Sequence, residues 1–439
     1  MKILFYLEPH FIRESSTQFT WIAKEIVKMY ENEFLLKKHN KSQHRLKMLV
    51  SRHVNNVLRN DLPVSSFKNL LLGIESKDND FIDQNYNIKW DEEAIDCWKD
   101  LLTGQGSITN FYVTLLEKAY REYPFDLIVY WGTNGAVKKF SNTYSIPSIS
   151  MELGPTRNPF FETLYFDFIG VNGNAYTNQV DLEEFESLYS IDEIQSILPI
   201  SMPNEKELDA MFNVLDIDIS NMIYGNLGKN VLIPLQLLDD TNIILYTKYQ
   251  SMFEFLSDVL PKLLEKGYIC YIKPHPGNVY REINKLDHEK CENFCQKQDS
   301  VYWLDNFDNA NNLLNLYSKM DYIVVLNSSV GFENMLLKNV VIPLGKSPYN
   351  IDKNLPTLDD LLNETINLEL YEETITKIVN MLLFNYLYFR RDFMSFDNFI
   401  NAIEYNIYLN DMFKKNSDKF KEQIRMKQIK SIVSYLNYK

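Results

Sequence analysis

Short apolar runs alternate with segments of helical period along most of the chain, and this alternation constrains the fold more than any other feature. Continuous apolar runs are typical of strands buried on both faces by helices. The pattern predicts an α/β fold with parallel sheets. Strands are expected at Lys2–Leu7, Leu46–Val50, Leu70–Leu72, Leu127–Trp131, Ser148–Met151, Val231–Leu235, Tyr268–Ile272, Tyr322–Leu326 and Val340–Leu344. Helices are expected at Trp21–Lys38, Ile108–Glu122, Ser251–Lys266, Ala310–Lys319 and Gly331–Leu337.

The alternation breaks once, between about Gly173 and Asn230, in an acidic stretch that we interpret as a connection. This break divides the 439 residues into two doubly wound, Rossmann-like domains, predicted at 1–225 and 226–385. Strands are expected to stop after about Leu368, and aromatic helical patterns follow at Tyr371–Tyr388 and Asn398–Met412. We predict C-terminal helices over 386–439, one of which returns to the first domain.

Composition and charge narrow the functional classes. A formal net charge of -14 argues against a general nucleic-acid binder. The longest apolar runs are too short to span a bilayer, and the opening residues lack the pattern of a secretory leader, so a cytoplasmic location is expected. Four cysteines are too few for a disulfide framework, and we interpret them as free thiols. A metal site at His288, Cys291 and Cys295 lacks a fourth ligand, so no metal is expected.

The segment from Phe413 to the end differs in charge from the rest. Its 27 residues hold eight Lys or Arg against two acidic residues, with apolar side chains interleaved. This pattern is typical of a basic amphipathic helix that contacts an anionic membrane surface. A helix packed on the protein itself, with a solvated basic face, is the equal alternative.

A loop containing His275 follows one expected strand. Prolines on both sides of His275 stiffen the loop and favour an extended backbone. A fixed imidazole beside the ammonium group of Lys273 suits a phosphate, through a hydrogen bond and a charge. The alternative is a capped loop histidine without such a role, and the position at a strand end favours binding.

A second cluster follows the expected strand at Tyr322–Leu326. The hydroxyls of Ser328 and Ser329, followed by Gly331 at a helix start, supply donors for an anion. Glu333 falls in the first turn, where its carboxylate suits ribose hydroxyls. A plain helix cap with a favourable carboxylate is the alternative.

Two further clusters carry carboxylates at strand ends. Gln236 precedes Asp239 and Asp240. These two carboxylates suit a metal, or a nucleophile and its neighbour, or, equally, a solvated acidic turn. Glu152 and Arg157 follow a strand of the first domain, and an Arg there suits the carboxylate of an acidic sugar. An ordinary surface loop is the alternative for Arg157.

The order of these pieces resembles the capsule polysaccharide biosynthesis family of retaining β-Kdo transferases. The matching motifs span about half of the chain. They are Glu152-x-Gly154 with Arg157, Gly170-Val171-Asn172, Pro234-Leu235-Gln236 with Asp240-Thr241, Lys273-Pro274-His275-Pro276-Gly277, Asn327-Ser328-Ser329-Val330-Gly331-Phe332-Glu333, Pro343-Leu344-Gly345 and Tyr349. The His-Pro and Ser-Ser motifs are shared with bacterial sialyltransferases and teichoic-acid glycerophosphotransferases.

The resemblance implies a GT-B type fold and a CMP-Kdo donor substrate, with a glycan or glycolipid acceptor. Asp240 is then the nucleophile, with Asp239 as fallback, and Glu152 the base for the acceptor hydroxyl. The phosphate and sugar of the donor are expected to contact the residues Lys273, His275, Ser328, Ser329, Gly331, Glu333, Arg157, Gln236 and Asn172. No metal or other cofactor is required. The alternatives are a sialyltransferase, a transferase of glycerol phosphate from CDP-glycerol, and a non-catalytic scaffold.

Overall fold

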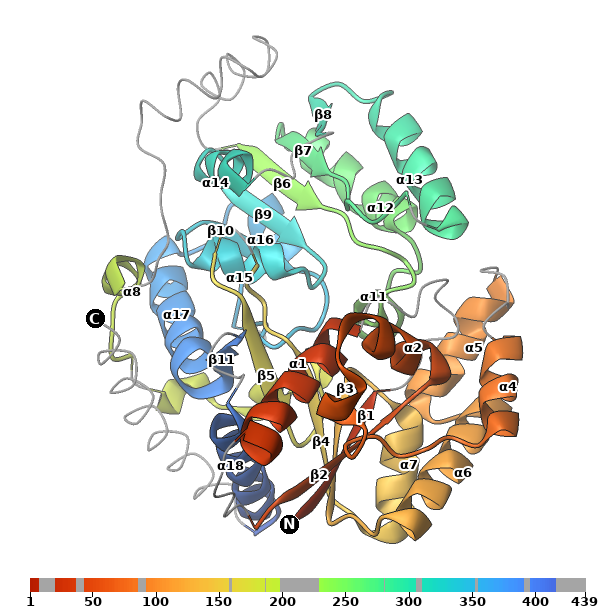
Figure 1. The fold of residues 1–439 in the computed structure, drawn as a ribbon. Coiled ribbons are helices and arrows are strands. Elements are labelled where there is room, and N and C mark those ends of the chain that lie inside the picture. The colour runs from red at the N-terminus through yellow and green to blue at the C-terminus, as the bar shows by residue number, and fades with distance from the viewer. Residues whose placement is uncertain are drawn as a thin grey trace. The chain divides into compact units, whose positions relative to one another are not determined.

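The computed structural model describes residues 1–7, 20–36, 43–85, 92–157, 160–185, 187–197, 229–279, 281–304, 310–351, 354–390 and 395–415. These residues form two compact units (Figure 1). The first contains the described parts of Met1–Glu152, Tyr165–Val171 and Tyr388–Phe420, and the second those of Leu153–Leu164 and Asn172–Leu387. The predicted boundary between residues 225 and 226 lies outside the described residues, and so does most of the basic segment after Phe413.

A six-stranded sheet with the order β11-β5-β4-β3-β1-β2 belongs to the first unit. Read from β2, this is the 2-1-3-4-5 order of doubly wound folds. Strand β1 is parallel to β2 and to β3, and β3 is parallel to β4. The strands are β1 (Lys2–Leu7), β2 (Arg45–Val50), β3 (Leu127–Trp131), β4 (Ser148–Leu153), β5 (Thr163–Asp167) and β11 (Leu387–Phe389).

Helices form two groups around this first sheet. One group consists of α1 (Thr20–Tyr30), which continues as a π-helical turn at Glu31–Leu36, α2 (Arg52–Asp61) and α3 (Val64–Phe67). The other consists of α5 (Glu92–Thr103), α6 (Gly106–Glu122) and α7 (Gly135–Tyr144). Helices α4 (Ser76–Asn85) and α18 (Phe396–Lys415) complete the unit. The predicted return of a C-terminal helix is therefore confirmed.

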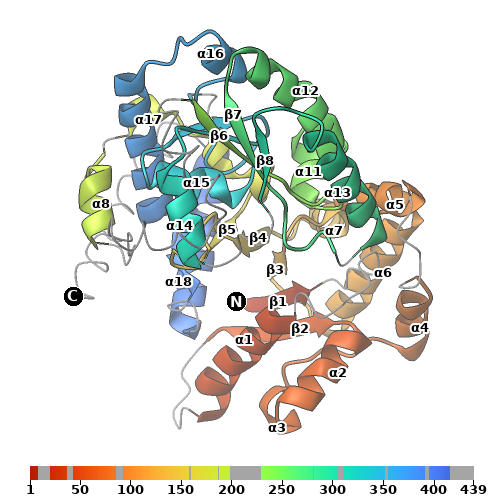
Figure 2. The same cartoon turned by 90° about the horizontal axis from the view of Figure 1, so that it is seen from above.

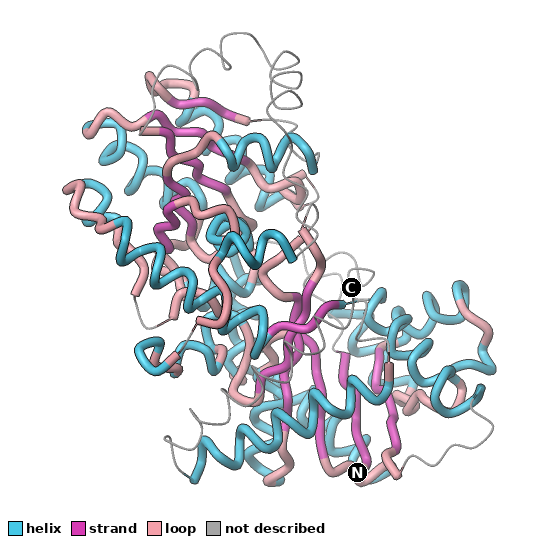
Figure 3. The backbone as a smooth tube through the Cα atoms, turned by 90° about the vertical axis from the view of Figure 1, so that its left-hand side faces the viewer, coloured by secondary structure: helices cyan, strands magenta, loops and turns pink. Residues whose placement is uncertain are grey.

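A five-stranded sheet with the order β10-β9-β6-β7-β8 forms the centre of the second unit (Figure 3). All of its strand pairs are parallel. In order of appearance the strands lie 5-4-1-2-3, which matches five of the six strands of a dinucleotide-binding sheet of order 3-2-1-4-5-6. They are β6 (Asn230–Pro234), β7 (Ile269–Lys273), β8 (Val301–Trp303), β9 (Tyr322–Val325) and β10 (Val340–Pro343).

Helices cover both faces of the second sheet (Figure 2). On one face lie α12 (Met252–Glu265) and α13 (Glu282–Cys295), and on the other α14 (Ala310–Ser318), α15 (Ser329–Met335) and α17 (Leu368–Met381). The remaining helices are α8 (Ile191–Ile197), α11 (Thr241–Tyr246) and α16 (Leu358–Leu362). Short 3₁₀ turns lie at Asn172–Asn174, Tyr176–Gln179 and Leu182–Glu184, and a π-helical turn at Leu382–Tyr386.

The predicted α/β fold of GT-B type is confirmed. Several of the individual strand predictions were wrong. The expected strand Leu70–Leu72 is a single bridge from Leu71 to Met48. The expectation that strands stop after Leu368 fails because β11 adds to the first sheet. Strands β5 and β8 were also missed. Strand β8 has three half-buried residues, too few to produce an apolar run.

Candidate active site

The order of the second sheet creates a topological switch point between β6 and β9. The chain proceeds from β6 to β7 on one side, while β9 pairs with β6 on the other. Ligands of such sheets bind outside the carboxyl ends of the strands at this position. The segments that leave β6 and β9 there carry Gln236 and Asn327, so two of the predicted motifs meet at the switch point.

A hydrogen-bond network joins these two segments. The amide Nε2 of Gln236 donates to Oδ1 of Asn327 at 3.0 Å, and the backbone N–H of Asn327 donates to Oε1 of Gln236 at 3.4 Å. Nδ2 of Asn327 donates in turn to the carbonyl of Asn242 in α11 at 2.9 Å. Asn327 was part of the predicted motif but was not assigned a role. It holds three segments together, because a primary amide both donates and accepts hydrogen bonds.

His275 lies in the loop after β7, as predicted, and its ring has a defined orientation. The backbone N–H of Gly277 donates to Nδ1 of His275 at 2.9 Å. Because Nδ1 accepts this bond, the neutral ring carries its proton on Nε2, which therefore acts as a donor. His275 and Gln236 line the same small cavity, of about 10 Å³, which is the volume needed for roughly one water molecule.

The start of α15 has the predicted cap. Oγ of Ser328 accepts from the backbone N–H of Val330 at 3.3 Å, and the helix begins at Ser329. Gly331 lies in α15 and packs against Tyr349. A Cβ at this position would lie 2.6 Å from the hydroxyl oxygen of Tyr349, which donates to the carbonyl of Ser328 at 2.5 Å. Gly331 is buried, and its lack of a side chain leaves room for the ring of Tyr349.

Glu333 is buried, with 4% of its surface exposed, although it was predicted to contact a ribose. Its Oε1 accepts from the backbone N–H of Arg157 at 2.9 Å, and its Oε2 accepts from the hydroxyl of Tyr317 at 3.5 Å. Burial raises the pKa of Glu333 to about 7, although the nearby Arg157 and Lys273 act to lower it. Glu333 thus anchors the loop of Arg157, a contact between residues far apart in sequence.

The guanidinium group of Arg157 folds back onto its own loop. Nη1 donates to the carbonyl of Thr156 at 2.9 Å and to that of Gly154. Arg157 and the buried Lys273 both act on the charge of Glu333, so the structure gathers these three predicted residues in the second unit.

The adjacent carboxylates Asp239 and Asp240 have different environments. Asp240 is half-buried and caps α11, with its Oδ1 accepting from the backbone N–H of Asn242 at 2.8 Å. Asp239 is fully buried and forms an ion pair with Arg281, with Nε to Oδ2 at 2.5 Å and Nη2 to Oδ1 at 2.8 Å. Asn284 adds a bond to Oδ1 at 3.0 Å. This pairing gives Asp239 a structural role, which argues against it as the fallback nucleophile.

Asn172 marks the point where a loop packs tightly against α11. Its backbone is left-handed, with φ of 58°, a conformation that Asn tolerates better than most residues. A Cβ on the following Gly173 would lie 2.5 Å from the ring of Tyr246 at the end of α11. The motif at Gly170 to Asn172 is therefore extended by a glycine that close packing requires.

Glu152 lies in the first unit, at the carboxyl end of β4. The neighbouring strand β3 ends in a turn at Gly132, whose φ of 71° favours glycine. A Cβ on Gly132 would lie 3.7 Å from Oε2 of Glu152, and Oγ of Ser150 donates to the Gly132 carbonyl at 2.5 Å. Glu152 thus stands beside a glycine turn at the edge where ligands of such sheets bind.

The described residues contain neither a metal-binding cluster nor a helix that could cross a membrane. No group of three His, Cys, Asp or Glu side chains in them has a metal-binding arrangement. Cys291 and Cys295 are buried, and the ring of His288 contacts the amide of Asn278. In the same part of the chain no helix combines the length and apolar character needed to cross a membrane.

The two sheets, with polar loops at the switch point of the second, define an α/β protein of GT-B type. Sequence comparison adds two matches to families related to glycosyltransferases. Residues 5–176 match the glycosyltransferase 99 family N-terminal domain, and residues 209–389 match the capsule polysaccharide biosynthesis proteins. The chain is therefore similar to capsule polysaccharide biosynthesis proteins over its second part and to the glycosyltransferase 99 type of N-terminal domain over its first. No functionally curated protein matches the sequence.

Solved structures with similar folds include two β-Kdo transferase structures of KpsC from Thermosulfurimonas dismutans. The structure of the 2,7 transferase is 19% identical, with a TM-score of 0.34, over 60% of this chain and 79% of that one. The structure of the 2,4 transferase is 14% identical, with a TM-score of 0.35, over 58% and 80%. UDP-GlcNAc 2-epimerase from Neisseria meningitidis is 12% identical, with a TM-score of 0.33, over 86% and 94%.

Proposed function

We propose that the protein is a retaining glycosyltransferase that moves Kdo from CMP-Kdo to a surface glycan, such as capsule, O-antigen or lipopolysaccharide. The proposal rests mainly on one observation. Predicted donor-site residues from three separate segments, Gln236, His275 and Ser328, lie at the carboxyl edge of one parallel sheet. Gln236 lines one small cavity with His275 and hydrogen-bonds to Asn327, the neighbour of Ser328. The family match supports the general class of activity.

The donor phosphate is assigned to the loops after β7 and β9. Nε2 of His275 donates a hydrogen bond to a phosphate oxygen, and Lys273 supplies positive charge as CMP departs. The hydroxyls of Ser328 and Ser329 add donors. We assign the carboxylate of the sugar to Arg157, whose loop Glu333 holds in place. In this proposal Glu333 acts on the donor through that loop rather than by touching the ribose.

The reaction takes place by two displacements at the anomeric carbon of Kdo. The Oδ2 atom of Asp240 attacks this carbon, the bond to the phosphate oxygen breaks, and CMP leaves with the electron pair. The acceptor hydroxyl then attacks the same carbon, its proton passes to Glu152, and the bond to Asp240 breaks. Two inversions give net retention. This chemistry requires no metal, because CMP is already a good leaving group.

Nucleotide release from separate donors tests the proposal. The protein is incubated with CMP-Kdo, CMP-sialic acid and CDP-glycerol in turn. Free CMP, which all three transfers release, is measured. We expect release from CMP-Kdo at the highest rate. Release only from CMP-sialic acid or only from CDP-glycerol would replace the donor assignment, and no release from any donor would favour a scaffold.

The location of the enzyme is a separate part of the proposal. A cytoplasmic protein with a basic segment from Phe413 onward would reach lipid-linked acceptors at an anionic membrane surface. Flotation with anionic liposomes compares the whole chain with one truncated before Phe413. We expect salt-sensitive flotation of the whole chain alone, and equal flotation of both would remove this contact.

A further inference from the structure

A cavity of about 270 Å³ lies in the first unit, away from all predicted site residues. The cavity lies at the carboxyl end of β2, beside Val50. It also borders the segment that follows Leu71, a residue that forms a parallel bridge with Met48 of β2. Helix α2 forms another wall. The cavity therefore lies at the carboxyl edge of a doubly wound sheet, beside its terminal strand β2, and its size is near the lower end of small-ligand pockets.

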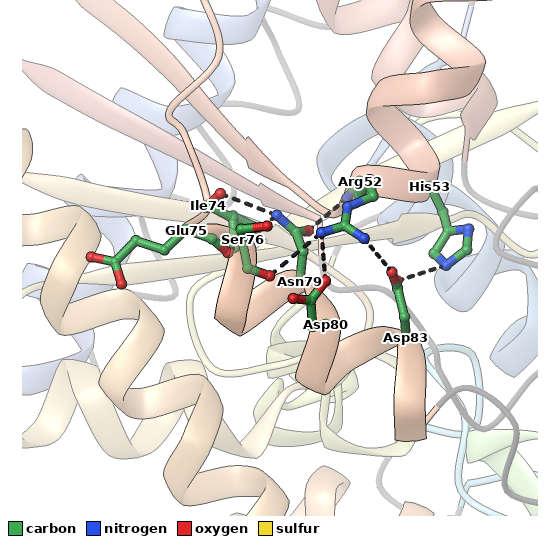
Figure 4. Close-up of polar contacts among 8 residues, drawn as sticks. All are labelled: Arg52, His53, Ile74, Glu75, Ser76, Asn79, Asp80 and Asp83. Carbon is green, nitrogen blue, oxygen red and sulfur yellow. Dashed lines mark hydrogen bonds and ion pairs between the residues drawn. The ribbon is translucent and has the colours of Figure 1, made fainter.

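Buried polar contacts fix one wall of this cavity. The backbone N–H of Arg52 donates to Oδ1 of Asn79 at 3.0 Å, and Nδ2 of Asn79 donates to the carbonyl of Ile74 at 3.1 Å (Figure 4). Asn79 is 8% exposed. These bonds connect the start of α2 with the segment before α4, so the cavity has a defined shape without a ligand.

The charge of the cavity is opposite to that of the chain. Three cations, Arg52, Arg59 and Lys68, belong to its lining, which includes no carboxylate among the described residues. Arg52 is already paired with Asp80 at 2.9 Å and Asp83 at 2.7 Å (Figure 4). Arg59 and Lys68 are exposed and carry two further positive charges, in a chain with a formal net charge of -14. A local reversal of this kind attracts an anionic ligand.

Apolar side chains supply the rest of the lining. The buried side chains of Val50, Phe67 and Leu72 contribute to the cavity lining. A sugar ring presents apolar C–H faces, and a carboxylated sugar adds one anionic group that Arg recognises well. We infer that this cavity binds a carboxylate-bearing sugar residue of the glycan acceptor. The assignment to the acceptor, though not the binding itself, rests on the proposed glycosyltransferase function.

Direct binding without any donor tests the inference. Calorimetry at low salt compares tri-galacturonate with maltotriose, a neutral trisaccharide. We expect the wild type to bind tri-galacturonate at least about tenfold more tightly than maltotriose, because the neutral probe leaves the basic side chains of the cavity without an anionic partner.

Two variants change the cavity in different ways. Arg59→Gln with Lys68→Gln removes both exposed charges and should weaken tri-galacturonate binding about tenfold. Gly73→Leu narrows the cavity, since Gly73 contributes to its lining and a Cβ there meets nothing within 4 Å, and should abolish binding. The matched control is Lys99→Gln with Arg121→Gln, two exposed cations of the first unit outside the cavity, and it should bind like the wild type. Circular dichroism checks that each variant is folded.

The inference is overturned if folded cavity variants bind tri-galacturonate like the wild type, or if the wild type does not bind it. Equal affinity for maltotriose would overturn the acidic class of ligand. If tri-galacturonate binds as expected but no donor releases its nucleotide, the cavity stands and the assignment to a transferase acceptor falls. Nucleotide release without this binding would leave the proposed function intact and remove the cavity.

Discussion

The carboxyl edges of the two sheets differ in how much of their polar surface is already paired. In the second unit, side-chain hydrogen bonds connect the segments after β6, β7 and β9, through Gln236 with Asn327 and through Arg281 with Asp239. The cavity that Gln236 and His275 share holds roughly one water molecule. In the first unit, the edge after β2 opens into a cavity of about 270 Å³ with exposed cations.

This difference indicates a division of labour. Polar groups fixed in advance suit a reaction centre, because they need little reorganisation when charge develops. An open cavity with long basic side chains suits recognition of a flexible glycan, because binding requires less exact placement of the ligand than catalysis does. If the carboxyl edge of the second sheet is the reaction centre, substitutions of its reacting groups should reduce turnover more than any others.

Asp240→Asn should give the largest loss of activity. The amide has nearly the same volume as the carboxylate and still accepts from the Asn242 N–H, but it is a poor nucleophile. Turnover of CMP-Kdo should fall on the order of 10⁴-fold with donor affinity largely preserved. Steady-state kinetics and donor titration measure both quantities. Robust transfer by this variant would exclude double displacement through Asp240.

Asp239→Ala should affect stability rather than chemistry. Without its partner, Arg281 keeps a buried and unbalanced charge, so the free energy of unfolding should fall by about 3–5 kcal/mol. Urea denaturation measures this loss. The double variant Asp239→Leu with Arg281→Met is the control and should recover much of the stability. An unchanged unfolding midpoint in Asp239→Ala would remove the structural role and reopen Asp239 as the nucleophile.

His275→Ala should lower turnover by at least about a hundredfold, as expected when a donor to the departing phosphate is lost. The side chain belongs to a loop, so the fold should persist. His288→Ala is a useful comparison, because His288 contacts the same loop through Asn278 but is assigned no donor contact. If both variants lose activity equally, the loop's position matters rather than the His275 ring.

Glu333→Gln should change how stability depends on pH. Burial places the pKa of Glu333 at about 7 in the folded chain, above its ordinary value of 4.5. The folded state therefore binds an extra proton between these values, and its stabilisation is lost as the pH rises from about 4.5 to about 7. The wild type should lose up to roughly 3 kcal/mol relative to the Gln variant over this range. Parallel stability curves from urea denaturation would show that Glu333 does not titrate there.

Much of the fold could be predicted because its central strands carry their own signal. Strand β3 was predicted with its exact bounds, and β1 likewise, since both are continuous apolar runs. Strand β11 was missed because its three residues directly follow a π-helical turn in an aromatic segment of helical period. Its strand character comes from pairing in the sheet, which the local sequence does not encode.

The site residues divide in a similar way. The strand-end position of His275 follows from local sequence. The burial of Glu333 could not be predicted, because it depends on the amide of Arg157, 176 residues earlier in the chain. The distinction between Asp239 and Asp240 depends on Arg281, 42 residues later. Such long-range partners decide which carboxylate is structural, and adjacent residues of the same type give no sequence signal to separate them.

Mass spectrometry of the intact protein tests the central claim most directly. The wild type is incubated with CMP-Kdo and no acceptor, and then digested for peptide mapping. The proposed mechanism predicts a mass increase of one Kdo, located on Asp240 and absent from the Asp240→Asn variant. An adduct on another residue, or efficient transfer with no covalent adduct under conditions that trap such intermediates, would contradict the assignment of the reaction centre.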